Sequence, residues 1–419
     1  MGAVSAAKAV SKTPTGQTTV FVMTAGLLAS WGLALWLFNA LSAQFTAFFA
    51  LSPTQWAWTH SLFGVVYFAL AGLAALFHRQ FGYKLGILFG LSVFALSAFL
   101  LYFGIISDSC GYFLGAIVML GVCGAWLDTS LTPLAVEAGR SQTSVVRLNL
   151  AYAFNGLGVL AGCIAARWLI QAHYKLSLGA TAQLSARPYV LVGLGGILLA
   201  YLIEQMSLPG FVTKRADKSS SVRGELYPLL GDRDFRLACA SLFAYFAVLT
   251  IIWSAYPHYS AHDLPGHSVG LIEKGFLWFA VGRCVGTVFM RWIDPVRLLQ
   301  WCTALCLIAI VMAAVLGGMY GWACLLSASL FLSITFPTVF GLAISRQRSC
   351  TKIASGVLMT ATGIGNALAP LFVTPALEVA NARIVVLLAL PFLAIILAYS
   401  LVPHSGSKED GNTEAQAAA

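Results

Sequence analysis

Charged residues are scarce in this 419-residue sequence. Asp, Glu, Lys and Arg make up only 9% of it, while 59% is hydrophobic and the mean hydropathy is +0.85. A soluble domain carries roughly 25% charged residues. The composition therefore excludes a soluble globular protein and indicates a chain that crosses a membrane many times. In such a protein the net charge of +9 reflects basic cytoplasmic loops, so we expect no nucleic acid partner.

Motifs for catalysis and for metal binding are also lacking. The sequence contains no GxSxG, HExxH or CxxC, and no Gly-rich phosphate loop after a strand. Its nine cysteines lie mostly within apolar runs, where they behave as small apolar residues. His258, His262 and His267 cluster in a Pro- and Gly-containing loop, for which a solvated surface is favoured over a metal site. We therefore expect neither an enzyme nor a bound cofactor or metal.

Long apolar runs dominate the sequence instead. A spanning helix needs about 20 apolar residues, and twelve runs meet that length while no strand-like alternation competes with them. The fold class that we predict is all-α integral membrane, with twelve transmembrane helices. The predicted spans are 20–46, 56–77, 84–104, 110–138, 147–171, 188–206, 236–258, 271–292, 296–318, 320–345, 352–376 and 384–402.

The longest polar stretch, Pro209 to Asp234, separates six of these spans from the other six. With the N-terminus inside, 18 of the 24 Lys and Arg residues fall in cytoplasmic segments, so both termini are expected in the cytoplasm. The predicted organisation is listed in chain order: a disordered tail (1–19), an N-terminal six-helix bundle (20–206), a cytoplasmic linker (207–235), a C-terminal six-helix bundle (236–403) and a second disordered tail (404–419).

The two halves are weakly similar to each other. Pro133 in the fourth span is matched by Pro337 in the tenth, and Gly156 and Gly158 are matched by a second glycine pair at 363 and 365. These offsets, of 204 and 207 positions, favour duplication of a six-helix unit, as in transporters whose halves enclose a site at mid-membrane. The alternative is that Gly and Pro are simply common in membrane helices.

Asp128 is a lone acid deep in the fourth span. It lies ten positions before Ala138, which places it about 15 Å from the cytoplasmic edge, at the middle of a ~30 Å hydrocarbon core. A carboxylate there costs a few kcal/mol or more unless it faces a partner, water or a cavity. Loss of hydration favours the neutral acid, so Asp128 is a candidate for exchanging a proton during transport. A purely structural pair with a buried Arg is the alternative.

Arg283 in the eighth span is the second deep charge, at a depth similar to that of Asp128. It could pair with Asp128 or share a cavity with it, or it could serve only to link helix ends. Asn39 lies among tryptophans in the first span, close to Trp31 and Trp36. Amides beside flat rings suit a sugar, whose hydroxyls need donors and acceptors and whose C–H faces stack on rings.

Four further polar residues are candidate contacts: Tyr152 and Asn155 in the fifth span, and Thr362 and Asn366 in the eleventh. Hydrogen bonding between helices is the alternative for each of these amides and hydroxyls, because it is a common packing device in membranes.

Several segments resemble one family, the fucose–galactose–hexose permease branch of the major facilitator superfamily. Residues 147–158 (RLNLAYAFNGLG) resemble its RLNLAQxFNxxG, 83–91 (YKLGILFGL) its YKxGIxxGL, 282–287 (GRCVGT) its GRxxGT, 333–340 (SITFPTVF) its SIxYPTIF, and Leu127-Asp128-Thr129, with Pro133 beyond, its LETAANP. The resemblance extends from the first span to the eleventh. It implies two six-helix bundles with pseudo-two-fold symmetry around a cavity that opens alternately to each side.

By this resemblance Asp128 takes the position of the family's proton-linked glutamate. Three positions depart from the family pattern: Asn39 replaces an acid of the first helix, Tyr152 replaces the glutamine of RLNLAQ, and Leu249 lies near a glutamate that many members carry in the seventh helix. An amide at position 39 still forms hydrogen bonds but cannot titrate.

We therefore expect a secondary active transporter of the bacterial inner membrane that moves a monosaccharide with protons. Asp128 would couple the proton and Arg283 would tune Asp128. The candidate substrate contacts are Asn39, Trp31, Trp36, Tyr152, Asn155, Arg283, Thr362 and Asn366. The alternatives are a facilitator or a carrier of another small polar solute, and a non-transporting membrane sensor. Apart from the sugar and the lipid bilayer we expect no partner, and the protein is expected to be a monomer.

Overall fold

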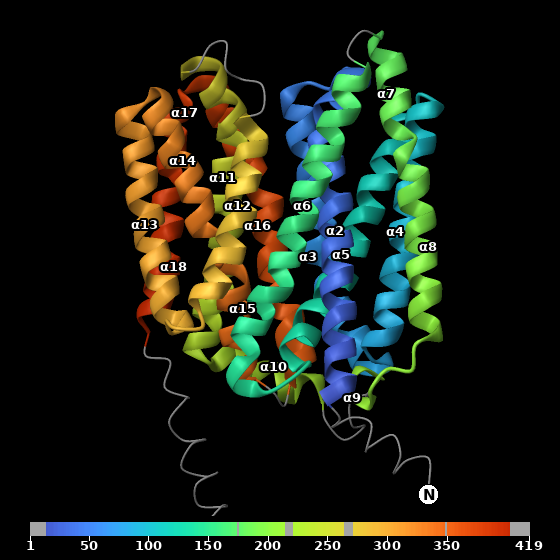
Figure 1. Cartoon of the computed structure of the whole chain (residues 1–419), viewed down its shortest axis with the longest axis vertical. Helices are drawn as coiled ribbons and strands as arrows, with labels where there is room; N and C mark the ends of the chain where they lie inside the picture. The colour runs from blue at the N-terminus through green and yellow to red at the C-terminus, as the bar shows by residue number, and fades with distance from the viewer. Residues whose placement is uncertain (1–13, 174–175, 214–220, 264–270, 348–349, 403–419) are drawn as a thin grey trace, which may run out of the picture.

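The structure is a computed structural model that describes residues 14–173, 176–213, 221–263, 271–347 and 350–402 (Figure 1). The described residues are helical and contain no β-strand. Most of the predicted tails, residues 1–13 and 403–419, lies outside this part of the chain. The first helix begins at Pro14, so residues 14–19, predicted as part of the tail, are helical.

The helices form two bundles that stand side by side (Figure 1). The N-terminal bundle contains α2 (Pro14–Phe48), α3 (Pro53–Phe81), α4 (Tyr83–Ile106), α5 (Cys110–Glu137), η1 (Ser141–Thr143), α6 (Ser144–His173), α7 (Leu178–Ala186) and α8 (Pro188–Gln205). The C-terminal bundle contains α11 (Arg233–Asp263), α12 (Leu271–Phe289), α13 (Pro295–Leu316), α14 (Gly318–Leu332), α15 (Thr335–Arg346), α16 (Thr351–Val379), α17 (Ala382–Val385), η3 (Val386–Leu388) and α18 (Ala389–Leu401). Two short helices, α9 (Gly210–Thr213) and α10 (Val222–Gly231), connect them.

The twelve predicted spans all correspond to helices, which confirms the predicted fold class. Eleven stretches of the described residues are long and apolar enough to cross a membrane. The remaining predicted span is α12, which is 19 residues long and carries Lys274 and Arg283. The tenth predicted span differs from the prediction because it is divided into α14 and α15, with Ser333 and Ile334 between them.

Local signals in the sequence fix where several helices begin. Ser52 caps α3 by accepting a hydrogen bond from the Gln55 amide, while the Gln55 side chain accepts one from the Ser52 amide. Asp294 caps α13, ahead of Pro295, by accepting hydrogen bonds from the Val296 and Arg297 amides. Gly82, between α3 and α4, has φ of 86°, and a Cβ there would lie 2.9 Å from the Thr213 carbonyl oxygen. This turn therefore requires glycine.

Glycines also allow the two bundles to approach each other closely. A Cβ on Gly363 of α16 would lie 2.6 Å from the Phe68 backbone of α3, and Gly156 of α6 lies against Ala280 of α12. Small residues at helix interfaces are the usual means of close packing in lipid. These contacts create the bundle interface, which is the surface where helices α2–α8 meet helices α11–α18.

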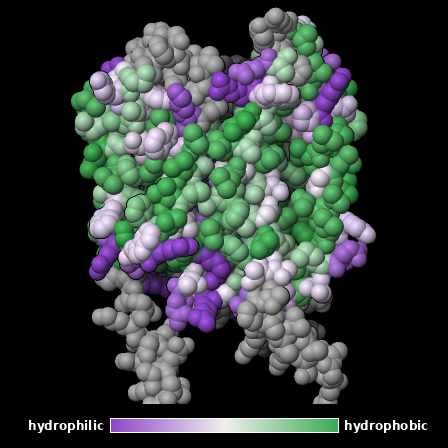
Figure 2. Space-filling model, viewed as in Figure 1, coloured by the Kyte–Doolittle hydropathy of each residue, from purple (hydrophilic) through white to green (hydrophobic). Residues whose placement is uncertain are grey.

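The exterior carries a broad hydrophobic band, with hydrophilic side chains gathered toward the two ends (Figure 2). This distribution is the one that a bilayer requires of a spanning protein. The start of α2 and the end of α18 lie at the same end of the molecule (Figure 1). We call this the terminal end.

The connecting segment contacts both bundles at the terminal end. Glu225 of α10 accepts hydrogen bonds from Arg79 of α3, with an N–O distance of 2.9 Å. Asp232, between α10 and α11, accepts a hydrogen bond from the Gln347 side chain, which follows α15, at 3.2 Å. The predicted linker therefore includes a helix that is bonded to the N-terminal bundle, in addition to joining the two halves along the chain.

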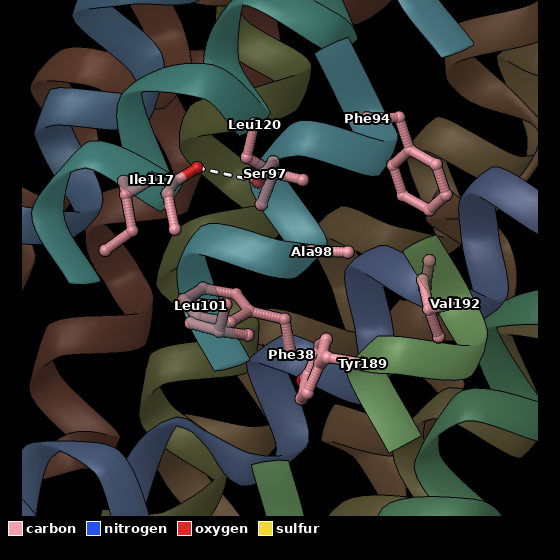
Figure 3. A pocket seen from close by; sticks show the side chains of 11 residues that line it. Phe38, Phe94, Ser97, Ala98, Leu101, Ile117, Leu120, Tyr189 and Val192 are labelled. Carbon is pink, nitrogen blue, oxygen red and sulfur yellow. Dashed lines mark hydrogen bonds between the residues drawn. The ribbon is translucent and has the colours of Figure 1, made fainter. Parts of the chain in front are cut away.

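One cavity lies inside the N-terminal bundle, away from the bundle interface (Figure 3). It lies among α2, α4, α5 and α8, and its space of about 340 Å³ is partly open to the outside. Its lining is almost wholly apolar, and the hydroxyl of Ser97 is bonded to the Ala116 carbonyl. It contains none of the predicted site residues.

Candidate functional site

Asp128 lies at the bundle interface. Its Oδ2 accepts a hydrogen bond from the Tyr67 hydroxyl of α3 at 3.0 Å, and that hydroxyl lies 3.3 Å from the sulfur of Met359 on α16. Asp128 keeps partial exposure although its neighbours in α5 are buried. The acid therefore does not face lipid, and one shared hydroxyl connects it to the opposite bundle.

Arg283 lies on the other side of the same interface and is only 5% exposed. Its Nη1 donates to the Tyr152 carbonyl at 3.0 Å and to the Asn155 Oδ1 at 2.8 Å, both on α6. Its Nε donates to the Ser333 carbonyl at 3.2 Å. The guanidinium also lies over the rings of Tyr152 and Phe279. Arg283 therefore joins α12 to α6 across the interface through neutral acceptors.

A proline explains why the Ser333 carbonyl is available to Arg283. Pro337 has no N–H, so the carbonyl four residues earlier, that of Ser333, has no donor from its own helix. The helix is interrupted there, between α14 and α15, and Arg283 donates the hydrogen bond that the Ser333 carbonyl would otherwise lack. The Ser333 carbonyl thus gains a donor, and the buried Arg283 guanidinium gains an acceptor.

A direct ion pair with Asp128 was one of the arrangements that the sequence left open for Arg283. Among the described residues, no ion pair joins these two side chains. They are connected indirectly: the Tyr152 hydroxyl, beneath the Arg283 guanidinium, lies 2.9 Å from the Thr132 hydroxyl, one turn along α5 from Asp128. Of the arrangements that the sequence left open, direct pairing is not the one found in the described residues, and Arg283 lies against the Tyr152 ring instead.

The amide of Asn155 is fully engaged within the protein. Its Nδ2 donates to the Leu28 carbonyl of α2 at 2.9 Å, and its Oδ1 accepts from Arg283. Asn39 is half-buried, and its Nδ2 donates to the Leu35 carbonyl of its own helix at 2.8 Å. Of these two amides, only Asn155 is bonded to Arg283 in the described residues.

The two predicted tryptophans have different surroundings. Trp36 packs edge-on against Trp253 of α11, with ring centroids 4.5 Å apart, and lies 4.6 Å from Phe276 of α12. Trp31 is buried inside the N-terminal bundle and packs edge-on against Phe94. Trp36 therefore spans the bundle interface, whereas Trp31 supports the packing of α2 on α4.

We call Trp36, Trp253, Phe276 and Phe279 the aromatic cluster. Trp253 contacts both phenylalanine rings at 5.1 and 5.2 Å, and the Phe279 ring lies under the Arg283 guanidinium at 4.5 Å. The cluster therefore extends from Arg283 toward the end opposite the terminal end, closing the space between α2, α11 and α12.

The predicted residues on α16 contribute less. Thr362 is buried and donates to the Met359 carbonyl of its own helix at 2.7 Å. Asn366 is half-buried where α16 packs against Gly64 of α3. Both face α3, so they lie on the interface but outside the Arg283 network.

Sequence reasoning missed Tyr67, Met359, Thr132 and Trp253. Tyr67 is a lone hydroxyl within an apolar run, the same signal that identified Asp128, and could have been found in this way. The others carry no such signal. Of the predicted histidine cluster, His258 is exposed, while the side chains of His262 and His267 lie outside the described residues. Within the described chain, no group of three or more His, Cys, Asp or Glu residues could hold a metal ion.

Two helical bundles that meet at an acid, a guanidinium and a set of amides and rings are the architecture of a membrane transporter. The chain belongs to the Major Facilitator Superfamily, whose sequence model matches residues 20–370.

The chain is similar to bacterial sugar transporters over most of its length. It is 27% identical to the L-fucose-proton symporter of Escherichia coli (strain K12) over 377 residues, covering 84% of this chain and 86% of the relative. It is 26% identical to a glucose/galactose transporter of Brucella abortus over 391 residues, covering 91% and 92%. Its structure aligns with that of FucP, a Major Facilitator Superfamily transporter in the outward conformation, with a TM-score of 0.80, 25% identity and coverage of 92% and 99%.

Proposed function

We propose that this protein is a secondary active transporter that moves a fucose- or hexose-like monosaccharide with protons by alternating access. The observation that carries the proposal is the link from Asp128 through Tyr67 to Met359, since it joins a titratable acid of one bundle to the other bundle. The proposal is supported by the sugars in the names of the relatives and by similarity over most of each chain.

Asp128 would act as the proton carrier of the cycle. A charged carboxylate at the interface is stabilised by the Tyr67 hydroxyl alone among the described contacts, whereas the neutral acid needs little compensation when the bundles close around it. Protonation from one side and release to the other would then be tied to the movement of Tyr67 and Met359 relative to α5. The coupling ion is a proton, and no other cofactor is proposed.

The sugar would bind between Asp128 and the aromatic cluster. Asn155 and Arg283 already exchange a hydrogen bond across the interface, so sugar hydroxyls inserted there can replace it with one bond to each partner. Trp36 offers a flat face for the C–H side of the ring. Asn39, Tyr152, Thr362 and Asn366 would contribute at the edges, and Trp31 would position α2.

We place the protein in a bacterial inner membrane with both termini in the cytoplasm, as a monomer. The orientation is supported by the shared terminal end of α2 and α18 and by the basic residues that the sequence concentrates on that side. The monomer is supported by the position of the site, which lies wholly between two bundles of a single chain.

A facilitator, or a carrier of another small polar solute, is the second candidate. The observation that favours it is Asn39, which stands where the family resemblance predicts a second acid and uses its amide on its own helix. With one acid fewer, fewer groups can carry protons. A non-transporting sensor has no specific structural support.

Uptake into proteoliposomes distinguishes these candidates. Labelled L-fucose, D-galactose and D-glucose are offered with and without an inward proton gradient, and then with a protonophore. A symporter accumulates its sugar above equilibrium and loses that accumulation with the protonophore. A facilitator reaches equilibrium under every condition, and absence of any sugar uptake would contradict the proposed substrate class.

A further inference from the structure

A basic and aromatic rim lies at the terminal end, where the turn between α12 and α13 is exposed. We define the basic rim as Arg291 and Trp292 of this turn, Arg297 and Trp301 of the first turns of α13, and Arg140 of the α5–α6 turn, all of which are exposed. Trp292 is 73% exposed and Trp301 56%. Exposed tryptophans beside arginines at a helix end are typical of the headgroup layer of a membrane.

The basic rim crosses from one bundle to the other. Met290, Leu298 and Ile334 form a small buried cluster beneath the α12–α13 turn, and Val146 of α6 packs against it. The α12–α13 turn therefore contacts the start of α6 directly, so a ligand bound along the rim touches both bundles.

The arginines of the basic rim have no acidic partner. In the part of the chain that the structure describes, neither Arg140, Arg291 nor Arg297 forms an ion pair. The one acid of the turn, Asp294, directs its Oδ1 at the Val296 and Arg297 amides of its own helix start. The rim is thus an exposed concentration of positive charge with its donors available.

An apolar strip lies on the same two helices, toward mid-membrane from the basic rim. Leu150, Phe154 and Leu157 of α6 and Val288 and Phe289 of α12 are all exposed. The two helices touch where Gly156 meets Ala280, so these exposed apolar side chains belong to two helices that lie in contact. Figure 2 shows hydrophilic side chains along the lower edge of the molecule beneath a hydrophobic band.

We propose that an anionic phospholipid binds here, with its phosphate on the basic rim and an acyl chain along the exposed apolar side chains of α6 and α12. Charge complementarity selects the headgroup, because basic pockets between helices at the cytoplasmic side recognise anionic lipids. The exposed apolar strip beside the rim favours a lipid over a soluble anion. Since α6 and α12 belong to different bundles, the bound lipid stabilises the arrangement in which they touch. This site does not depend on the identity of the transported sugar.

Native mass spectrometry of the full-length protein tests the proposal. Delipidated protein is titrated with palmitoyl-oleoyl phosphatidylglycerol, with the phosphatidylcholine of the same chains, and with glycerol 1-phosphate. We expect saturable binding of phosphatidylglycerol that weakens about 30-fold in the Arg291→Gln/Arg297→Gln double variant. The matched control is Arg167→Gln, at the opposite end of α6, where the exposed arginine precedes Trp168, itself 72% exposed.

Three results would overturn the assignment: unchanged binding in the double variant, an equal loss in the Arg167→Gln control, or glycerol 1-phosphate binding as tightly as the lipid. The last result would identify a site for a free anion. Binding is compared only on protein that keeps the unfolding temperature of the wild type. If the double variant fails that criterion, Arg297→Gln alone is measured, with an expected loss of about fivefold.

Discussion

Two prolines lie at corresponding positions of the two bundles, and the carbonyl that each leaves without a helical donor is bonded differently. Pro133 of α5 and Pro337 of α15 lie 204 positions apart, and each lacks the N–H that would bond the carbonyl four residues before it. Those carbonyls belong to Thr129 and Ser333. In the N-terminal bundle α5 continues without a break, whereas in the C-terminal bundle the helix divides into α14 and α15.

The two carbonyls receive donors of different kinds. Thr129 accepts from the Ser355 hydroxyl of α16, across the bundle interface, at 3.2 Å. Ser333 accepts from Arg283 of its own bundle, also at 3.2 Å. The first bond holds the bundles together one residue from Asp128. The second orients a charge that reaches α6. In both bundles the proline thus leads to a hydrogen bond beside the interface. The bond to Thr129 joins the two bundles, whereas the bond to Ser333 orients Arg283 from within its own bundle.

Loss of Arg283 has the largest expected effect. Arg283→Met removes charge-assisted hydrogen bonds worth about 1.5–3 kcal/mol each, and leaves the Ser333 carbonyl and the Asn155 Oδ1 without a donor. We expect the initial uptake rate in proteoliposomes to fall roughly 100-fold. Arg283→Lys is the control, because it keeps the charge without the fork of donors and should lie between. A Met variant within threefold of the wild type would contradict the role given to this network.

Replacing each proline by alanine restores the missing N–H and so tests whether the two bundles depend on its absence to different degrees. In Pro337→Ala the new amide competes with Arg283 for the Ser333 carbonyl, so we expect uptake to fall about 10-fold, by the loss of one charge-assisted hydrogen bond of roughly 1.5 kcal/mol. In Pro133→Ala the new amide competes only with Ser355, and we expect about a threefold fall. Initial rates of both variants are compared in one preparation. Equal effects would show that the two prolines are not used differently.

Ser355→Ala removes the hydroxyl that crosses the interface to Thr129. The expected cost is about 1 kcal/mol, read as a fall of a few degrees in the unfolding temperature of the purified protein. Ser327→Ala is the matched control, since that hydroxyl donates only to the Ala323 carbonyl of its own helix. If both variants lower the unfolding temperature equally, the bond across the interface adds no more stability than a hydroxyl bond within one helix.

The smallest effect is expected at the terminal end, far from both prolines. Glu225→Gln weakens the pair with Arg79, a partly exposed ion pair worth up to about 1 kcal/mol, so uptake should change less than about threefold. Glu204→Gln is the comparison, because its distance of 3.9 Å from Lys84 and its higher exposure predict no measurable change. A large loss in Glu225→Gln would show that α10 controls the cycle.

The sequence predicted the parts of the fold that depend on hydropathy and length. Asp128 was located at mid-membrane from its distance to a span end, and both prolines were recognised as a pair. Hydropathy does not report how each helix is rotated, so Trp31 was assigned to the site although it packs inside one bundle against Phe94. Whether a tryptophan faces the core or the interface depends on contacts between helices distant in sequence.

The partner of Arg283 was unpredictable for a related reason. A buried guanidinium can be compensated by an acid or by several neutral acceptors, and the sequence offered Asp128 as the only acid at matching depth. The carbonyl that Pro337 frees is invisible in a hydropathy profile, as is the break between α14 and α15. The sequence nevertheless shows that Pro337 has no N–H. Counting back four residues then identifies the Ser333 carbonyl as the one left without a donor.

The central claim is that Asp128 carries the proton that accompanies the sugar. Proteoliposomes in a weakly buffered medium test it most directly, by recording the external pH when the transported sugar is added without an imposed gradient. The account predicts that the medium becomes more alkaline with the wild-type protein, and that Asp128→Asn abolishes this change while still exchanging labelled for unlabelled sugar. Proton movement that persists with the sugar in Asp128→Asn would contradict the account.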